Sequence, residues 1–174
     1  MNINIWPYIE LSRALINKRR RGNGNMFRHQ LETFAILLEY GYKDPVLLKA
    51  ALIHDLFEDG QRVGFSDFQS VISIDEDGKE VFELVRELSI KVENNIEEPK
   101  SQYLERIMTE GTIRAQALKL ADRISNINAL PATRDMLFIK KYIDETNTHI
   151  LPYSKGIDKN MAAELKRSLS MFEV

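Results

Sequence analysis

Apolar residues recur at helical spacing, and not at the alternating spacing of strands, in nearly every long segment of this 174-residue chain. The pattern restricts the fold to a helical class, because a half-buried strand needs apolar residues at every second position. We therefore predict an all-α fold, a helical bundle of about eight to ten helices. The hydrophobic content of 44% suits one core, and no break in composition divides the chain, so residues 1–174 are expected to form a single domain.

Local signals set the expected ends of the helices. Pro7 and Pro45 fall in first turns, and Gly41 and Gly60 follow last turns. A loop is expected around Gly22–Asn25, whose residues adopt left-handed backbone readily, and an exposed loop at the charged, asparagine-rich residues 91–100. The expected helices cover residues 7–18, 26–40, 45–60, 66–72, 79–89, 101–109, 112–130, 136–151 and 158–172.

Charge and composition exclude several classes of function. The net charge of −2 argues against general nucleic-acid binding, since no basic excess is present to neutralise phosphates along a duplex. The chain has no cysteine, so any metal must be held by imidazole nitrogen and carboxylate oxygen. The first ten residues show no basic n-region and no long apolar h-region, so no signal peptide is expected, and no apolar run is long enough to cross a bilayer. A soluble, cytoplasmic protein without a membrane partner is expected.

One short motif, His54-Asp55-Leu56-Phe57-Glu58-Asp59, gathers an imidazole and three carboxylates. On a helix, His54 and Glu58 would share one row and Asp55 and Asp59 the next. Carboxylates this close repel one another unless a cation lies among them, and the place beside His54 and Asp55 suits one. A charged helix face exposed to solvent is the alternative.

One helix cannot complete a coordination sphere, so further ligands must come from elsewhere in the chain. Only two other histidines exist, and His29 is the better candidate, because His149 has no carboxylate nearby and suits packing or the surface. Asp122 lies beside an apolar stripe of a helix expected to be buried, where it needs a cation or hydrogen-bond donors. An ion pair with a lysine or arginine remains the alternative, and Asn126 lies one turn further on the same row.

A histidine, a histidine-aspartate pair 25 residues later and a distant aspartate resemble the HD phosphohydrolase superfamily. ALIHDLFED and KLADRISNINAL resemble the hydrolase domain of the RelA/SpoT alarmone enzymes, especially the stand-alone small hydrolases of the metazoan SpoT homologue type. The spacing from Arg20-Arg21 to His29 matches the family as well, as do Glu145-Thr146 and Pro152. The resemblance covers residues 18–157, with departures at Asn25-Met26, where the family has proline-tyrosine, and at Gly60, where it has a small or hydroxylated residue.

The resemblance implies a single divalent ion, usually Mn²⁺, held by His29, His54, Asp55 and Asp122. It implies a small nucleotide substrate, guanosine tetra- or pentaphosphate, from which 3′-pyrophosphate is removed as in the stringent response. Glu58 and Asp59 would position and deprotonate the attacking water, and the choice of base between them stays open. The residues that would contact the substrate are Arg20, Arg21, Lys119, Asn126 and Tyr142.

Three other interpretations remain at this stage. The same core could act on another nucleotide, such as an adenosine alarmone, a nucleoside 5′-monophosphate or a phosphorylated cofactor, because the departures at Asn25 and Met26 affect the loop that would hold the base. A non-catalytic alarmone-binding protein would not need Glu58 and Asp59. A purely structural helical protein would leave His54, Asp55 and Asp122 without a purpose. The oligomeric state and any paired synthetase are not encoded in these patterns.

Overall fold

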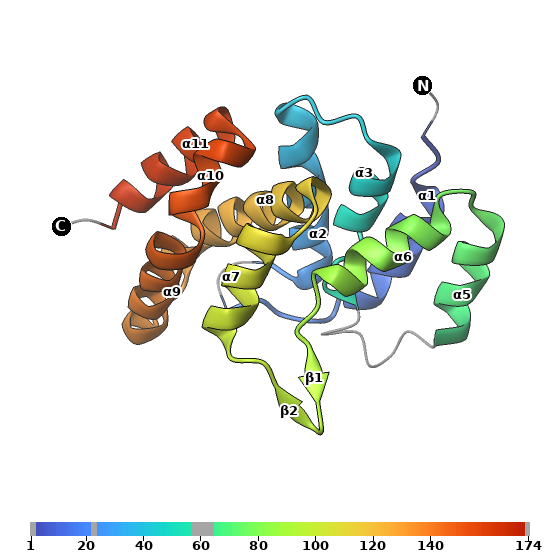
Figure 1. Cartoon of the computed structure of the whole chain (residues 1–174), viewed down its shortest axis with the longest axis horizontal. Coiled ribbons are helices and arrows are strands. Elements are labelled where there is room, and N and C mark those ends of the chain that lie inside the picture. The colour runs from blue at the N-terminus through green and yellow to red at the C-terminus, as the bar shows by residue number, and fades with distance from the viewer. Residues whose placement is uncertain (1–2, 22–23, 57–64, 173–174) are drawn as a thin grey trace. The chain divides into compact units, whose positions relative to one another are not determined.

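The computed structural model describes residues 3–21, 24–56 and 65–172. These residues form ten α-helices, two short 3₁₀ helices and one small hairpin, so the all-α prediction is confirmed (Figure 1). The chain divides into two compact units, residues 1–20 with 24–89 and residues 21–23 with 90–174, and each is described by itself. Among the described helices, none is both long enough and apolar enough to span a bilayer.

The first unit is built around α3, in which every residue from Val46 to Ala51 is buried. α3 packs against α2 and α6, and α5 packs against α1 and α6. Lys49 is the one charged side chain within α3, and it reaches Asp75 and Asp77 between α5 and α6. The elements are α1 (Trp6–Ser12), η1 (Arg13–Leu15), α2 (Met26–Glu39), α3 (Pro45–Ala51), α5 (Phe65–Ile74) and α6 (Gly78–Glu87).

Capping explains where α2 and α3 begin. The side chain of Asn25 accepts a hydrogen bond from the backbone N–H of Arg28 at 2.8 Å, so the residue that departs from the family pattern serves as an N-cap. Asp44 caps α3 in the same way, ahead of Pro45. Gly24 and Gly41 have φ angles of +79° and +81°, which confirms the predicted left-handed positions in the loop and after α2.

The second unit is arranged around α8, which contacts α7, α10 and α11. Eleven of its residues are buried, including Lys119, Asp122 and Arg123. Thr112 caps α8 by accepting a hydrogen bond from the N–H of Ala115 at 3.2 Å. The elements are β1 (Val92–Glu93), β2 (Ile96–Glu97), α7 (Lys100–Glu110), α8 (Ile113–Ala129), η2 (Leu130–Ala132), α9 (Met136–His149), α10 (Leu151–Ile157) and α11 (Lys159–Ser170).

Two local predictions are wrong in this unit. Residues 91–100 were expected to be loop throughout, but Val92–Glu93 and Ile96–Glu97 pair as an antiparallel hairpin. Asn94 and Asn95 have φ angles of 52° and 62°, and two left-handed residues give the turn that two-residue hairpins favour. The expected helices over residues 136–151 and 158–172 left residues 152–157 outside any helix, but residues 151–157 form the separate helix α10. Pro152 lies in the permitted first turn of α10.

Candidate metal centre

His29 enters the site from the first turn of α2. The residue is 1% exposed, because α2 turns its His29, Gln30, Thr33 and Leu37 positions inward. Asn25 fixes the beginning of this helix and therefore the direction of the His29 side chain. A buried imidazole in such a place needs polar partners, and within the first unit its Nε2 lies 3.4 Å from Oδ2 of Asp55.

His54 and Asp55 lie in a turn after α3, so the predicted helix over residues 45–60 is wrong at residues 52–55. Beyond Ala51 the backbone N–H groups of Leu52 and Ile53 bond three residues back, to Lys49 and Ala50. The side chain of His54 contributes to the change, since its Nδ1 lies 2.9 Å from the carbonyl oxygen of Ala51. A carbonyl oxygen only accepts, so Nδ1 is the protonated nitrogen and Nε2 is the atom left to act as a ligand.

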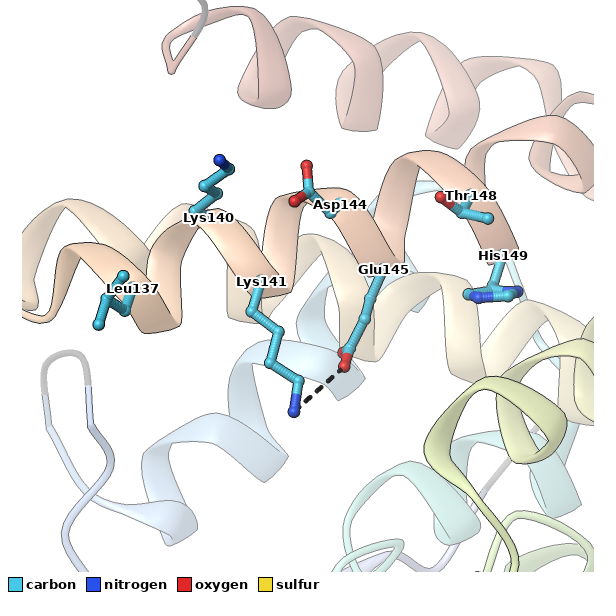
Figure 2. A pocket seen from close by; sticks show the side chains of 7 residues that line it. All are labelled: Leu137, Lys140, Lys141, Asp144, Glu145, Thr148 and His149. Carbon is cyan, nitrogen blue, oxygen red and sulfur yellow. Dashed lines mark ion pairs between the residues drawn. The ribbon is translucent and has the colours of Figure 1, made fainter.

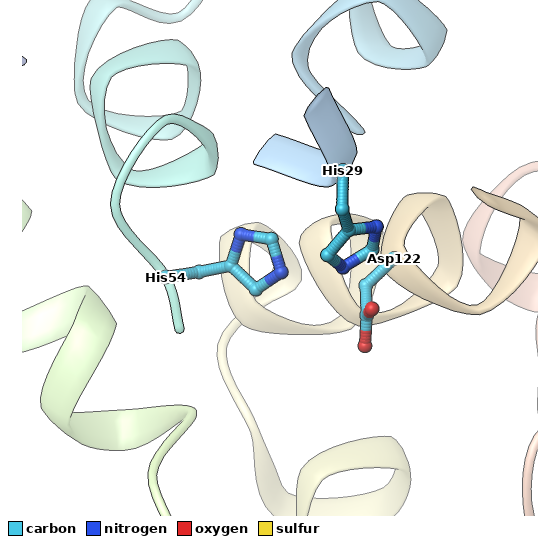
Figure 3. A group of neighbouring side chains, drawn as sticks. All are labelled: His29, His54 and Asp122. Atoms are coloured by element: carbon cyan, nitrogen blue, oxygen red, sulfur yellow. The ribbon is translucent and has the colours of Figure 1, made fainter. Parts of the chain in front are cut away.

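Both imidazoles converge on one carboxylate oxygen. His29 Nε2 and His54 Nε2 each lie 3.4 Å from Asp55 Oδ2, and the two ring centroids are 5.2 Å apart. Figure 3 shows the His29 and His54 rings pointing toward one another. Metal–ligand bonds of roughly 2.0–2.2 Å place two ligands of one ion roughly 3.0–3.6 Å apart. In the described part of the first unit, one carboxylate oxygen thus lies at a distance from each of two nitrogens that suits ligands of one first-row ion.

Asp122 is the buried carboxylate of α8, at 6% exposure. Lys119 donates to its Oδ2 at 2.8 Å, and the Asn126 amide donates to its Oδ1. Burial alone would lower the pKa of Lys119, but the charge of Asp122 and then that of Tyr103 outweigh it, so the pKa is raised. Asp122 therefore forms an ion pair with a lysine, which was the alternative to a metal-ligand role in the sequence analysis. Each carboxylate oxygen keeps a second lone pair, and His29, His54 and Asp122 are all buried residues able to offer a ligand atom.

Arg20 and Arg21, which precede α2, have different surroundings. The Arg20 side chain is 5% exposed and donates to Glu32 Oε2 at 3.0 Å, so its guanidinium is held within the first unit. Arg21 belongs to the second unit, where it lies over the Phe138 ring at 4.7 Å. Arg21 is thus the arginine that contacts an aromatic ring within the second unit.

A cleft of about 680 Å³ lies in the second unit, beside Arg21. Its aromatic wall consists of Phe138 and Tyr142, whose ring centroids are 5.6 Å apart, and Arg123 covers the Tyr142 ring at 4.1 Å. Three cationic residues and two acidic residues line it, a mixture suited to an anion that carries a flat ring. The lining residues are Arg21, Lys100, Asp135, Leu137, Phe138, Lys141, Tyr142 and Glu145.

A shallower depression follows the side of α9 and shares Leu137, Lys141 and Glu145 with the cleft. Figure 2 shows its side chains along the helix, with Lys141 Nζ 3.9 Å from Glu145 Oε1. His149 lies at its far end and is half-buried, in agreement with the expectation that this histidine serves packing or the surface. The expectation that His149 has no carboxylate nearby is wrong, because Asp144 and Glu145 line the same depression.

The predicted catalytic pair, Glu58 and Asp59, lies outside the described residues, as does Gly60. Their roles therefore stay predictions.

Comparison with solved structures identifies a similar fold. The structure of a metazoan orthologue of SpoT, which hydrolyses ppGpp and plays a role in starvation responses, has a TM-score of 0.76 to this chain and 21% sequence identity, with 95% of each chain covered. No protein-family model matches the sequence, and no curated protein sequence matches it significantly. The resemblance predicted from the motifs is therefore confirmed at the level of the fold.

Proposed function

We propose that this protein is an HD-type, metal-dependent phosphohydrolase that removes pyrophosphate from the 3′ position of guanosine tetra- or pentaphosphate. One observation carries the proposal: His29 Nε2 and His54 Nε2 both lie 3.4 Å from Asp55 Oδ2, at the end of a buried helix. Two imidazoles and a carboxylate suit a borderline divalent ion. The fold it shares with a ppGpp-hydrolysing protein supports the choice of substrate.

Asp122 is proposed as the fourth protein ligand. It is buried, and Lys119 and Asn126 hold its two oxygens in fixed directions. We assign Lys119 and Asn126 first to the orientation of this carboxylate, and their predicted contacts with substrate remain proposals. The ion that fits this mixed nitrogen and oxygen set, and that the family resemblance implies, is Mn²⁺.

An ion held by His29, His54, Asp55 and Asp122 would supply Lewis-acid chemistry, because it would neutralise charge on a phosphate oxygen and lower the pKa of a nearby water. The chain's own residues provide position and proton transfer. His54 keeps its Nδ1–H on the Ala51 carbonyl, so its ring holds one tautomer and one direction throughout. Glu58 and Asp59 are proposed to orient the water and to accept its proton while its oxygen bonds to the phosphorus attached to the ribose 3′ oxygen. The bond from that phosphorus to the 3′ oxygen breaks, the 3′ oxygen leaves and takes up a proton, and the phosphorus departs with the water oxygen as pyrophosphate.

The cleft of the second unit is proposed to hold the nucleotide. A purine can stack on Phe138 or Tyr142, while Arg21 and Lys100 offer positive charge to phosphates. The resemblance implies that Arg20 packs on the base and that Arg21 contacts a phosphate. We propose Arg21 as the main contact of the two, because the Arg20 guanidinium is paired with Glu32.

The test is a product analysis with chelator-stripped protein reloaded with Mn²⁺. Guanosine 3′,5′-bis(diphosphate) should yield guanosine diphosphate and pyrophosphate, and the activity should disappear when the ion is removed and return when it is restored. An equal concentration of the adenosine analogue and of guanosine 5′-monophosphate completes the panel. Release of orthophosphate, or faster turnover of the monophosphate, would contradict the proposed reaction and favour a nucleotidase.

A further inference from the structure

A side chain that the metal-binding motif does not include contacts the proposed ligand Asp55. Gln30 follows His29 on α2 and is fully buried, at 0% exposure. Its Nε2 donates a hydrogen bond to Asp55 Oδ2 at 3.0 Å, across 25 residues of sequence and within the first unit. The oxygen that faces both imidazoles is therefore the one that Gln30 holds.

The orientation of the Gln30 amide follows from chemistry. An ionised carboxylate only accepts hydrogen bonds, so the amide must present its NH₂ group to Asp55. Its Oε1 is then turned away, and it has no hydrogen-bond partner among residues 3–21, 24–56 and 65–172. A buried oxygen without a partner costs stability. This side chain is thus poorly suited to a purely structural role, since an apolar residue of the same shape would avoid that cost.

We propose that Gln30 is a positioning residue for the metal site, an inference that rests on the proposed function. The amide occupies one lone-pair direction of Asp55 Oδ2 and thereby turns the other toward the space between His29 Nε2 and His54 Nε2. A carboxylate oriented before the ion arrives loses less freedom on binding it, and hydrogen bonds of this kind affect metal affinity strongly.

Thr33 provides a matched control on the same helix. It lies one turn after Gln30, is also 0% exposed, and its Oγ1 likewise has no hydrogen-bond partner among the described residues. Thr33→Val removes a buried polar atom without removing a donor to Asp55. Gln30→Met removes a buried polar atom and that donor together while keeping the length and shape of the side chain.

The experiment measures Mn²⁺ affinity of the chelator-stripped full chain, the electron paramagnetic resonance spectrum of the bound ion, and the melting temperature. Gln30→Met should weaken Mn²⁺ binding by about 10- to 100-fold and change the spectrum of the bound ion. Thr33→Val should leave affinity and spectrum unchanged, and neither variant should melt far below the wild type. If Gln30→Met does not fold, Gln30→Leu replaces it in the same measurements.

Three outcomes would contradict parts of the reasoning. If the wild type binds Mn²⁺ and the Gln30 variant binds it equally well with the same spectrum, the positioning role is wrong and the proposed function stands. If the wild type binds no divalent ion, the proposed function is wrong and the role of Gln30 falls with it. A loss of Mn²⁺ affinity equal in Thr33→Val and Gln30→Met would also overturn the inference, because the effect would then come from helix packing.

Discussion

Replacing Lys49 by methionine should destabilise the first unit strongly, although the residue lies outside the proposed site. Lys49 is 3% exposed, and its Nζ donates to both oxygens of Asp75 at 2.9 Å and to Asp77 Oδ2 at 2.7 Å. Tyr8 donates to the same Asp75 at 2.6 Å. The cluster links α1 and α3 to the connection between α5 and α6, so it holds in place the helix that precedes His54 and Asp55.

The expected loss can be estimated from the partners left behind. Removing one member of a buried charged cluster typically costs about 3–5 kcal/mol, because the remaining charge stays buried without compensation. The side chains of Asp75 and Asp77 are 17% and 26% exposed, and Asp75 keeps Tyr8, so the lower end of that range applies. We predict a loss of about 3 kcal/mol in the free energy of unfolding.

Urea denaturation at pH 7 measures this loss. With an m-value of about 2 kcal/mol/M, the midpoint should fall by about 1.5 M. Lys79→Met is the control, because Lys79 is 85% exposed and lies 4.0 Å from Glu83, so that its loss should change stability by less than about 0.5 kcal/mol. A loss below about 1 kcal/mol for Lys49→Met would refute the argument that this lysine compensates the two aspartates.

The stability lost in Lys49→Met should depend on pH in a definite direction. Burial by itself would raise the pKa of Asp75, but the hydrogen bonds from Lys49 and Tyr8 outweigh it, so the pKa lies below its ordinary value. A lowered carboxyl pKa adds stability above the unfolded-state value of about 3.9, and that stability is lost as the pH falls through the folded-state pKa. The difference between wild type and Lys49→Met should therefore be full at pH 7 and shrink in acid.

Three further predictions concern the proposed site. Asp55→Ala should abolish Mn²⁺ retention in a metal assay after desalting, together with turnover. Glu58→Gln and Asp59→Asn should retain the ion while lowering the turnover number by on the order of 10²-fold, and full activity in both variants would move water activation elsewhere. Arg21→Ala should raise the Michaelis constant roughly tenfold with little change in the turnover number. Arg20→Ala should mainly lower the free energy of unfolding. The expected loss is about 1 kcal/mol, since the partner Glu32 is 36% exposed.

The sequence was sufficient to predict where a helix begins when a capping side chain marks its first turn. Asp44-Pro45 and Thr112 were expected to begin helices, and both cap through their side chains. The same signals failed after Ala51, because the run from Val46 to Ile53 is buried on every side. Apart from Lys49 the run is apolar, so it has no periodicity to mark where the helix ends. The hydrogen bond from His54 Nδ1 to the Ala51 carbonyl is a contact that no helix propensity includes.

The hairpin could have been recognised. Asn94 and Asn95 are residue types that tolerate left-handed backbone, and they separate two β-branched residues, Val92 and Ile96. The surrounding charges favoured a loop instead. Pro152 could likewise have been recognised as a first-turn proline, because it lies in the first turn of α10.

Some residues of the proposed site could be predicted from the sequence, and others could not. His29 and His54 were predicted as ligands from residue type and spacing, and both face Asp55. The bonds from Lys119 and Asn126 to Asp122 follow the three- and four-residue spacing of a helix, so they could have been predicted. The role of Gln30 could not have been predicted, because its contact with Asp55 joins α2 to the turn after α3 through tertiary packing and its sequence neighbourhood carries no motif.

The most direct test of the proposed metal centre is a crystal structure of the Mn²⁺-loaded protein with anomalous diffraction data. The account predicts one anomalous peak within roughly 2.0–2.3 Å of His29 Nε2, His54 Nε2 and an oxygen of Asp55, with Asp122 as the fourth ligand. A peak that contacts only one of the two imidazoles, or no peak beside Asp55 at saturating Mn²⁺, would contradict it.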